Sequence, residues 1–142
     1  MTRTVWFKAA ALWSAILLLA VLNGILRERM LISVLGSFAG LIASGAILSI
    51  SIFLVAFVAV PWFGPAAFRQ WLRIGLFWLL LTLLFEFSFG RLIQHKTWAE
   101  LFDAYTFRGG NLWPVVLAFV FISPWLAARI RGFVHDPGLN RF

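Results

Sequence analysis

The sequence predicts an all-α integral membrane protein: a four-transmembrane-helix bundle with a short interfacial amphipathic helix between the third and fourth helices. The first observation is composition, because the 142-residue chain is 63% hydrophobic and only 12% charged. A soluble domain has about 45–50% apolar and about 25% charged residues. The second observation is that four apolar runs approach the roughly 20 residues that a helix needs to cross a bilayer. Residues 1–142 are therefore expected to form a single membrane domain.

The first apolar run covers residues 5–26 and is predicted to be a retained helix. It is too long for the apolar part of a signal peptide, and no small-residue cleavage pattern follows it. The helix is expected to end at Arg27-Glu28-Arg29, with Asn23 one turn before Arg27 on the same face. Two interpretations stay open. The arginines extend toward lipid headgroups, or Asn23 and Arg27 line a polar site at one face of the membrane.

The second run covers residues 36–60 and carries small residues four positions apart, at Gly36, Gly40 and Ser44. This spacing lets helix backbones approach closely, so we expect a helix-packing seam, either within the chain or between copies. A polar path along the serines is the weaker alternative, because serines in such helices usually bond their own backbone. Proline and glycine in residues 61–65 predict the turn that ends this run.

The third run, residues 66–90, contains Glu86, the only acidic side chain inside any of the four apolar runs. Gly75, Thr82 and Glu86 recur on one helical face, so this face is expected to pack against protein, with Gly75 in helix packing. A carboxylate at membrane depth costs roughly 2.5 kcal/mol or more, so such a residue is expected to have a partner.

The partner of Glu86 is predicted from the alternating directions of the helices. These bring the ends of the first and third runs to the same face of the membrane. Asn23 and Arg27 then lie at about the depth of Glu86, and with Thr82 they form a predicted intramembrane polar site. Glu86 is expected to contact Asn23 or an arginine, with Arg27 favoured. The other candidate arginines are Arg29, Arg91 and Arg108.

The connection after the third run predicts a short helix along the membrane surface, over residues 98–105. Thr97 and Glu100 match a capping box, in which the two side chains satisfy backbone N–H groups at the helix start. Apolar side chains follow at helical spacing, which places them on one face. They are Trp98, Leu101, Phe102 and Tyr105. We expect Trp98 and Leu101 in lipid and Glu100 in water.

The fourth run covers residues 112–130 and follows a loop with two glycines. Two interpretations of the loop are open: a tight turn, or an anion site where backbone N–H groups at a helix start lie beside an arginine. Asn111 is a good N-cap for the helix. The predicted anion or headgroup site comprises Arg29, Arg91, Arg108, Gly109, Gly110 and Asn111.

The placement of basic residues predicts which side of the membrane each terminus occupies. Four spans put both termini on one side, which carries seven lysines and arginines against five on the other. The positive-inside rule then favours cytoplasmic termini, in a bacterial inner membrane. The seven are Arg3, Lys8, Arg69, Arg73, Arg129, Arg131 and Arg141, and the five are Arg27, Arg29, Arg91, Lys96 and Arg108.

Candidate chemistry is sparse. The chain has no cysteine, which excludes disulfides and cysteine metal sites. His95 and His135 are expected on opposite faces of the membrane, where they cannot share a metal ion, and neither lies within a span to hold a haem. No serine-centred or metal-ligand motif is present, so we expect no catalytic residue, metal or cofactor. The basic residues flank apolar runs, so their expected partners are lipid headgroups and not nucleic acid.

Three functional hypotheses follow. The first is a non-catalytic bundle that assembles with itself or as a subunit of a larger membrane complex, which the small-residue seam favours. The second is a binder or carrier of an anionic lipid or amphiphile at the outer membrane face, using the arginines there. The third is an ion or proton pathway through Glu86. It is the weakest, because no charged residue continues the path toward the cytoplasm.

Overall fold

Four long helices dominate the structure, a computed structural model that describes residues 3–103, 106 and 112–135. The elements are α1 (Arg3–Leu26), the π-helical turn η1 (Arg27–Leu31), α2 (Ile32–Leu35), α3 (Ser37–Phe63), β1 (Ala66–Ala67), α4 (Phe68–Leu92), α5 (Trp98–Asp103), α6 (Trp113–Arg131) and β2 (Val134–His135). Four helical segments are long and apolar enough to cross a membrane: Arg3–Leu35, α3, α4 and α6. The prediction of four such helices is confirmed, and the short α5 lies before the fourth.

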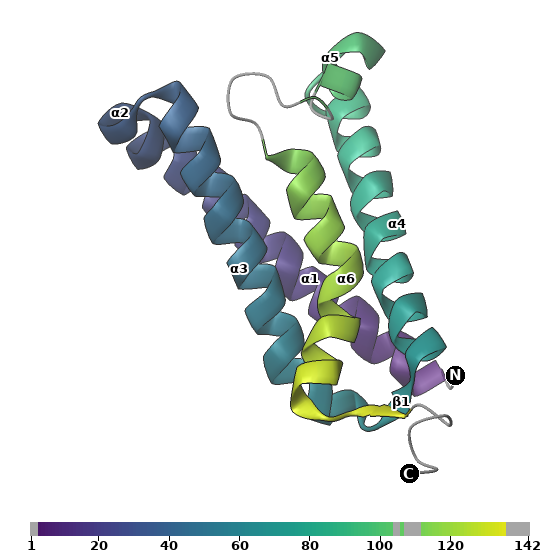
Figure 1. Cartoon of the computed structure of the whole chain (residues 1–142). Helices are drawn as coiled ribbons and strands as arrows, with labels where there is room; N and C mark the ends of the chain where they lie inside the picture. The colour runs from purple at the N-terminus through teal and green to yellow at the C-terminus, as the bar shows by residue number, and fades with distance from the viewer. Residues whose placement is uncertain (1–2, 104–105, 107–111, 136–142) are drawn as a thin grey trace.

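The helices form a bundle in which α6 packs against both α3 and α4 (Figure 1). α1 runs antiparallel to α3 and also contacts α4. The start of α1, the end of α3, the start of α4 and the end of α6 gather at one end, the β1 end. The end of α1, the start of α3, the end of α4 and the start of α6 lie at the opposite end, the α5 end. At the β1 end, β1 and β2 form a two-residue parallel pair that joins the start of α4 to the segment after α6.

Two tryptophan side chains are buried within the bundle. Trp71 and Trp78 of α4 are fully buried. A buried indole N–H needs an acceptor. Trp78 Nε1 donates to the Ala9 carbonyl of α1 at 2.9 Å, and Trp71 Nε1 donates to the Phe133 carbonyl at 3.3 Å. These two bonds join α4 to α1 and to the segment that follows α6.

The backbones of α4 and α6 touch at Gly75. A Cβ built on Gly75 would overlap the carbonyl oxygen of Phe121. Only glycine therefore permits this approach, as in other close helix pairs where a small residue lets two backbones meet. Gly75 is buried, on the face of α4 that was expected to pack against protein.

The first helix is longer than expected. It does not end at Arg27-Glu28-Arg29 but continues through η1 and α2 to Leu35. Long basic side chains reach polar surroundings from inside a helix, so a charged cluster does not by itself stop one. The chain reverses at Gly36, whose φ of 86° is readily adopted by glycine. Gly36 therefore forms a turn, whereas it was expected in the packing seam.

The rest of the small-residue seam packs within the chain. A Cβ built on Gly40 would lie 3.0 Å from Cα of Ile32 and from the carbonyl carbon of Leu31, so α3 folds tightly back on η1 and α2. One turn later, Ser44 is bonded to Asn23 of α1. The seam thus brings α1 and α2 onto the first part of α3.

Proline does not end α3 where the sequence indicated a turn. The helix continues through Pro61 to Phe63 and ends at Gly64, whose φ is 80°. Proline has no N–H to offer the carbonyl four residues earlier, which is that of Phe57. Arg131 of α6 replaces the missing donor: its Nη1 bonds the Phe57 carbonyl at 2.8 Å, and its guanidinium lies 4.9 Å from the Phe57 ring centroid. This contact holds the ends of α3 and α6 together.

Alanine at Gly75 tests the close approach of α4 and α6. Gly75→Ala is expected to lower the unfolding free energy by about 1–3 kcal/mol, because the added methyl group must push the two backbones apart. The matched control is Gly24→Ala in α1, where the nearest atom to a new Cβ is 3.8 Å away. That variant should be neutral or gain up to about 1 kcal/mol from helix propensity. Thermal unfolding in detergent measures both variants. A Gly75→Ala protein as stable as the Gly24→Ala protein would refute the contact.

The arginine that replaces the missing proline N–H is tested by a double-mutant cycle. Arg131→Met should cost about 0.5–1.5 kcal/mol, the value of an ordinary hydrogen bond. In a Pro61→Ala background residue 61 regains its N–H for the Phe57 carbonyl, so the cost of Arg131→Met should shrink. Arg129→Met is the control, because Arg129 contacts the Trp125 ring and its cost should not depend on residue 61. An Arg131 cost that is the same in both backgrounds would exclude this role.

Candidate functional site

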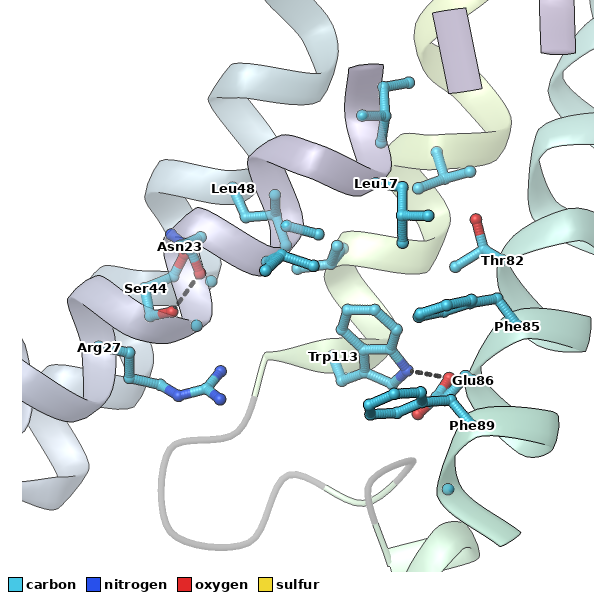
Figure 2. A pocket seen from close by; sticks show the side chains of 18 of the residues that line it. Leu17, Asn23, Arg27, Ser44, Leu48, Thr82, Phe85, Glu86, Phe89 and Trp113 are labelled. Atoms are coloured by element: carbon cyan, nitrogen blue, oxygen red, sulfur yellow. Dashed lines mark hydrogen bonds between the residues drawn. The ribbon is translucent and has the colours of Figure 1, made fainter. Parts of the chain in front are cut away.

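A cavity of about 360 Å³ opens at the α5 end, between α1, α3, α4 and α6 (Figure 2). Its volume falls within the range of small-molecule pockets, which are mostly apolar with a few placed polar groups. The inner wall is apolar: Ile16, Leu17, Ala20, Leu48, Ile52, Val116 and Val120. Polar and charged side chains line the cavity nearer its opening: Asn23, Arg27, Ser44, Glu86, Gln94, Lys96 and Glu100. The lining therefore changes from apolar to polar toward the α5 end.

Glu86 lies on the cavity wall and is bonded to a tryptophan. Trp113, the first residue of α6, donates its Nε1–H to Glu86 Oε2 at 2.7 Å (Figure 2). Hydrogen bonds to a charged acceptor are shorter and stronger than those between neutral groups. This bond ties the end of α4 to the start of α6. The indole was not among the partners expected for Glu86.

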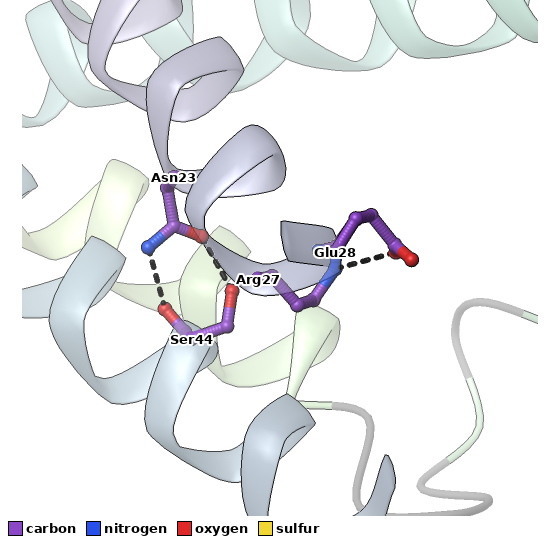
Figure 3. Close-up of polar contacts among 4 residues, drawn as sticks. All are labelled: Asn23, Arg27, Glu28 and Ser44. Atoms are coloured by element: carbon purple, nitrogen blue, oxygen red, sulfur yellow. Dashed lines mark hydrogen bonds and ion pairs between the residues drawn. The ribbon is translucent and has the colours of Figure 1, made fainter. Parts of the chain in front are cut away.

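Asn23, expected as a partner of Glu86, instead pairs with Ser44. Ser44 Oγ donates to Asn23 Oδ1 at 2.5 Å, and Asn23 Nδ2 donates to the Ser44 carbonyl at 3.1 Å (Figure 3). Both residues are buried. Because the amide and the hydroxyl satisfy each other, the pair joins α1 to α3. Thr82 likewise serves a helix contact, accepting from Trp13 Nε1 at 3.0 Å.

Arg27, the favoured partner of Glu86, pairs with Glu28 instead. Its Nε lies 3.2 Å from Glu28 Oε1, and the two side chains are 35% and 65% exposed, so the ion pair contributes little stability. The guanidinium extends into the cavity (Figure 2). Its Nη2 lies 3.8 Å from where a Cβ of Gly24 would be, so the side chain folds back along α1. Arg27 also begins the π-helical turn, a feature frequent at functional sites.

Lys96 is a second cation of the cavity, and sequence reasoning did not select it. After α4 the chain turns back through His95, which has a φ of 55°. Lys96 N then bonds the Gly90 carbonyl at 2.8 Å, and Arg91 Nη1 bonds the Lys96 carbonyl at 2.9 Å. The turn brings Lys96 to the cavity lining. A left-handed conformation at a histidine gives no clear signal in sequence, because it is uncommon outside glycine.

The structure describes two residues of the predicted anion site, Arg29 and Arg91. Arg29 is exposed and does not line the cavity. Arg91 is engaged with the Lys96 carbonyl and lies 5.0 Å from the Trp98 ring centroid. The remaining members, Arg108, Gly109, Gly110 and Asn111, lie outside the described residues.

The short helix α5 covers one end of the cavity. Thr97 caps it: Thr97 Oγ1 accepts from Glu100 N at 3.1 Å and donates to Glu100 Oε1 at 3.3 Å. Leu101, expected in lipid, is instead buried in the protein, where it packs on Gly90 and lines the cavity. Trp98 is 54% exposed, and Phe102 is 58% exposed. Tyr105, the last residue of the expected helix, lies outside the described residues.

The charges of the lining favour an anionic ligand. Both carboxylates already have protein partners, Trp113 for Glu86 and Thr97 for Glu100. Within the described residues, the Lys96 ammonium and the two Nη groups of Arg27 have no hydrogen-bond partner. Across the same described residues, no group of three His, Asp or Glu side chains is placed to hold a metal ion. The cavity therefore offers two cationic groups beside an apolar wall.

The buried pair of Asn23 and Ser44 is tested by another cycle. Ser44→Ala should cost about 0.6 kcal/mol and at most about 1.7 kcal/mol, the measured range for hydrogen bonds between membrane helices. The cost should vanish when Asn23 is already alanine. Ser51→Ala is the matched control, because Ser51 Oγ bonds the Ile47 carbonyl of its own helix. Thermal unfolding is the measurement, and an unchanged cost in the Asn23→Ala background would show that the residues are not coupled.

The functional inference rests on the residues that line the cavity. No family model, curated protein or solved structure matches the chain. The site is a partly enclosed cavity with apolar walls, two cationic groups and a carboxylate that accepts a hydrogen bond from an indole.

Proposed function

We propose that the protein is an integral membrane protein that binds an amphiphile with a phosphate or carboxylate head and an apolar chain. The head lies between Arg27 and Lys96, and the chain lies along the apolar wall of the cavity. One observation supports this above the others: the Arg27 Nη groups and the Lys96 ammonium have no hydrogen-bond partner among the described residues, and both residues line the same cavity as the apolar wall.

The membrane setting is supported by the outer surface of the four long helices. Large apolar side chains are exposed along them, including Leu18 at 61%, Val58 at 74% and Leu84 at 65%. Contiguous apolar surface of this kind is rare on soluble proteins. The distribution of basic residues supports a bacterial inner membrane with both termini in the cytoplasm. The cavity then opens toward the outer face.

An amphiphile fits the lining better than a soluble anion or a moving ion does. A soluble anion would occupy the region of Arg27 and leave the apolar wall uncovered. An ion or proton would need polar groups along the inner wall, and the described side chains between Thr82 and the β1 end of the cavity are apolar or indole. A ligand with a charged head and an apolar chain contacts both kinds of lining.

The charge of the head group is expected to determine which lipid binds. A chain that leaves the bilayer for the cavity exchanges one apolar environment for another, so it contributes little net free energy. Hydrogen bonds to charged groups contribute about 1.5–3 kcal/mol each. Discrimination between lipids is therefore expected to follow head charge more than chain length.

Self-assembly, the first functional hypothesis, is less well supported. The small-residue seam was its main argument, and these residues are used inside one chain. Gly40 packs on Ile32, Ser44 bonds Asn23, and Gly75 packs on Phe121. The seam thus gives no separate reason to expect a second copy.

Binding is tested with the purified protein in detergent by native mass spectrometry. The probes are lysophosphatidate, the uncharged monoacylglycerol with the same chain, and glycerol phosphate as the head alone. Lysophosphatidate should bind, monoacylglycerol should bind far more weakly, and glycerol phosphate should not bind measurably. Equal binding of the two lipids would contradict the proposed head site.

Charge-removing variants locate the site. Arg27→Gln and Lys96→Gln should each weaken lysophosphatidate binding roughly 10–100-fold, since each removes a charged donor worth about 1.5–3 kcal/mol. Arg29→Gln is the matched control, because it lies in the same π-helical turn but outside the cavity. A loss with Arg29→Gln as large as with Arg27→Gln would point to a general charge effect.

A further inference from the structure

We propose that the amphiphile enters sideways from the bilayer, through an opening between α1 and α4. This inference rests on the proposed function and adds the route and the source of the ligand. Three observations support it. α1 and α4 touch toward the β1 end, exposed side chains of both helices line the cavity from that contact onward, and the rim changes from apolar to polar toward the α5 end.

α1 and α4 contact each other toward the β1 end. The Trp6 and Phe77 ring centroids lie 5.1 Å apart, and the bond from Trp78 to Ala9 follows. Trp13 makes the next contact, with Thr82 and with the Phe85 ring at 6.3 Å. Beyond Trp13, no hydrogen bond or ring contact joins these helices within the described residues. The two ribbons diverge from there toward the α5 end (Figure 1).

From that last contact onward, toward the α5 end, residues of both helices line the cavity. Leu17, Val21 and Gly24 do so from α1, and Phe85 and Phe89 do so from α4. Val21 is 49% exposed, Phe85 36% and Phe89 38%. Because these exposed side chains line the cavity where α1 and α4 diverge, they mark the rim of its opening. The rim between α1 and α4 is therefore apolar.

The rim changes character at the α5 end. There it carries Gln94, Lys96 and Glu100, which are exposed and polar. The apolar edge and the polar edge belong to one cavity. A lipid standing in the outer leaflet has the same order, with its head toward water and its chain toward the bilayer centre. Such a molecule can move in between α1 and α4 without taking its chain through water.

The opening is tested by joining its two edges. The chain contains no cysteine, so Val21→Cys together with Phe89→Cys supplies the only two thiols. The protein is placed in nanodiscs, and a cleavable bis-maleimide links the pair. Capture of radiolabelled lysophosphatidate from donor vesicles is then followed in time. Linking should slow capture at least tenfold, and cleaving the linker should restore the rate.

Two controls separate the route from the site. The same linker on Trp6→Cys with Phe77→Cys, where the helices already touch, should leave the capture rate unchanged. Val21→Trp narrows the rim without a linker and should also slow capture. If the wild-type protein captures no probe, the proposed function fails. If it captures the probe, and linked Val21→Cys/Phe89→Cys protein captures as fast as unlinked protein, the lateral route is overturned.

Discussion

The hydrogen bond from the Trp78 indole to the Ala9 carbonyl fixes where α1 meets α4, and the cavity depends on that meeting point. The indole N–H is buried and finds no water as an alternative partner, so breaking the bond would leave it unsatisfied, whereas the Ala9 carbonyl would keep its hydrogen bond within α1. Trp13 and Thr82 make the next contact along the same pair of helices. α1 then continues toward α3, where Asn23 bonds Ser44, and the space left beside α4 becomes the cavity.

The two ends of the bundle differ in what their basic side chains bond. At the β1 end, Arg131 bonds the Phe57 carbonyl and Lys8 bonds the Trp62 carbonyl, so cationic side chains are used to hold helix ends together. At the α5 end, Arg27 and Lys96 line a cavity and have no described carbonyl acceptor for their side chains. Arg131 and Lys8 thus hold helix ends together, whereas the Arg27 Nη groups and the Lys96 ammonium remain available for a ligand.

The sequence predicted the location of the candidate site better than it predicted the contacts within it. Glu86, Asn23 and Arg27 were expected at one end of the bundle, and all three line one cavity there. Their pairing was expected to follow charge. Among the described residues, Arg27 reaches the adjacent Glu28, Asn23 reaches Ser44, and Glu86 accepts from Trp113. An indole N–H is a suitable donor for a carboxylate, yet tryptophan in an apolar run is usually assigned to packing or to the interface.

By itself, the sequence determined the four long apolar helices and the capped helix beginning after Thr97, because length, hydropathy and capping act between near neighbours in the chain. Only the tertiary structure decided that the first helix continues past Arg27 to Leu35, that Leu101 is buried on Gly90, and that Lys96 turns back to the cavity. These features depend on how closely helices far apart in sequence approach. That approach is set by contacts such as Gly75 on the Phe121 carbonyl, whose partner no local pattern identifies.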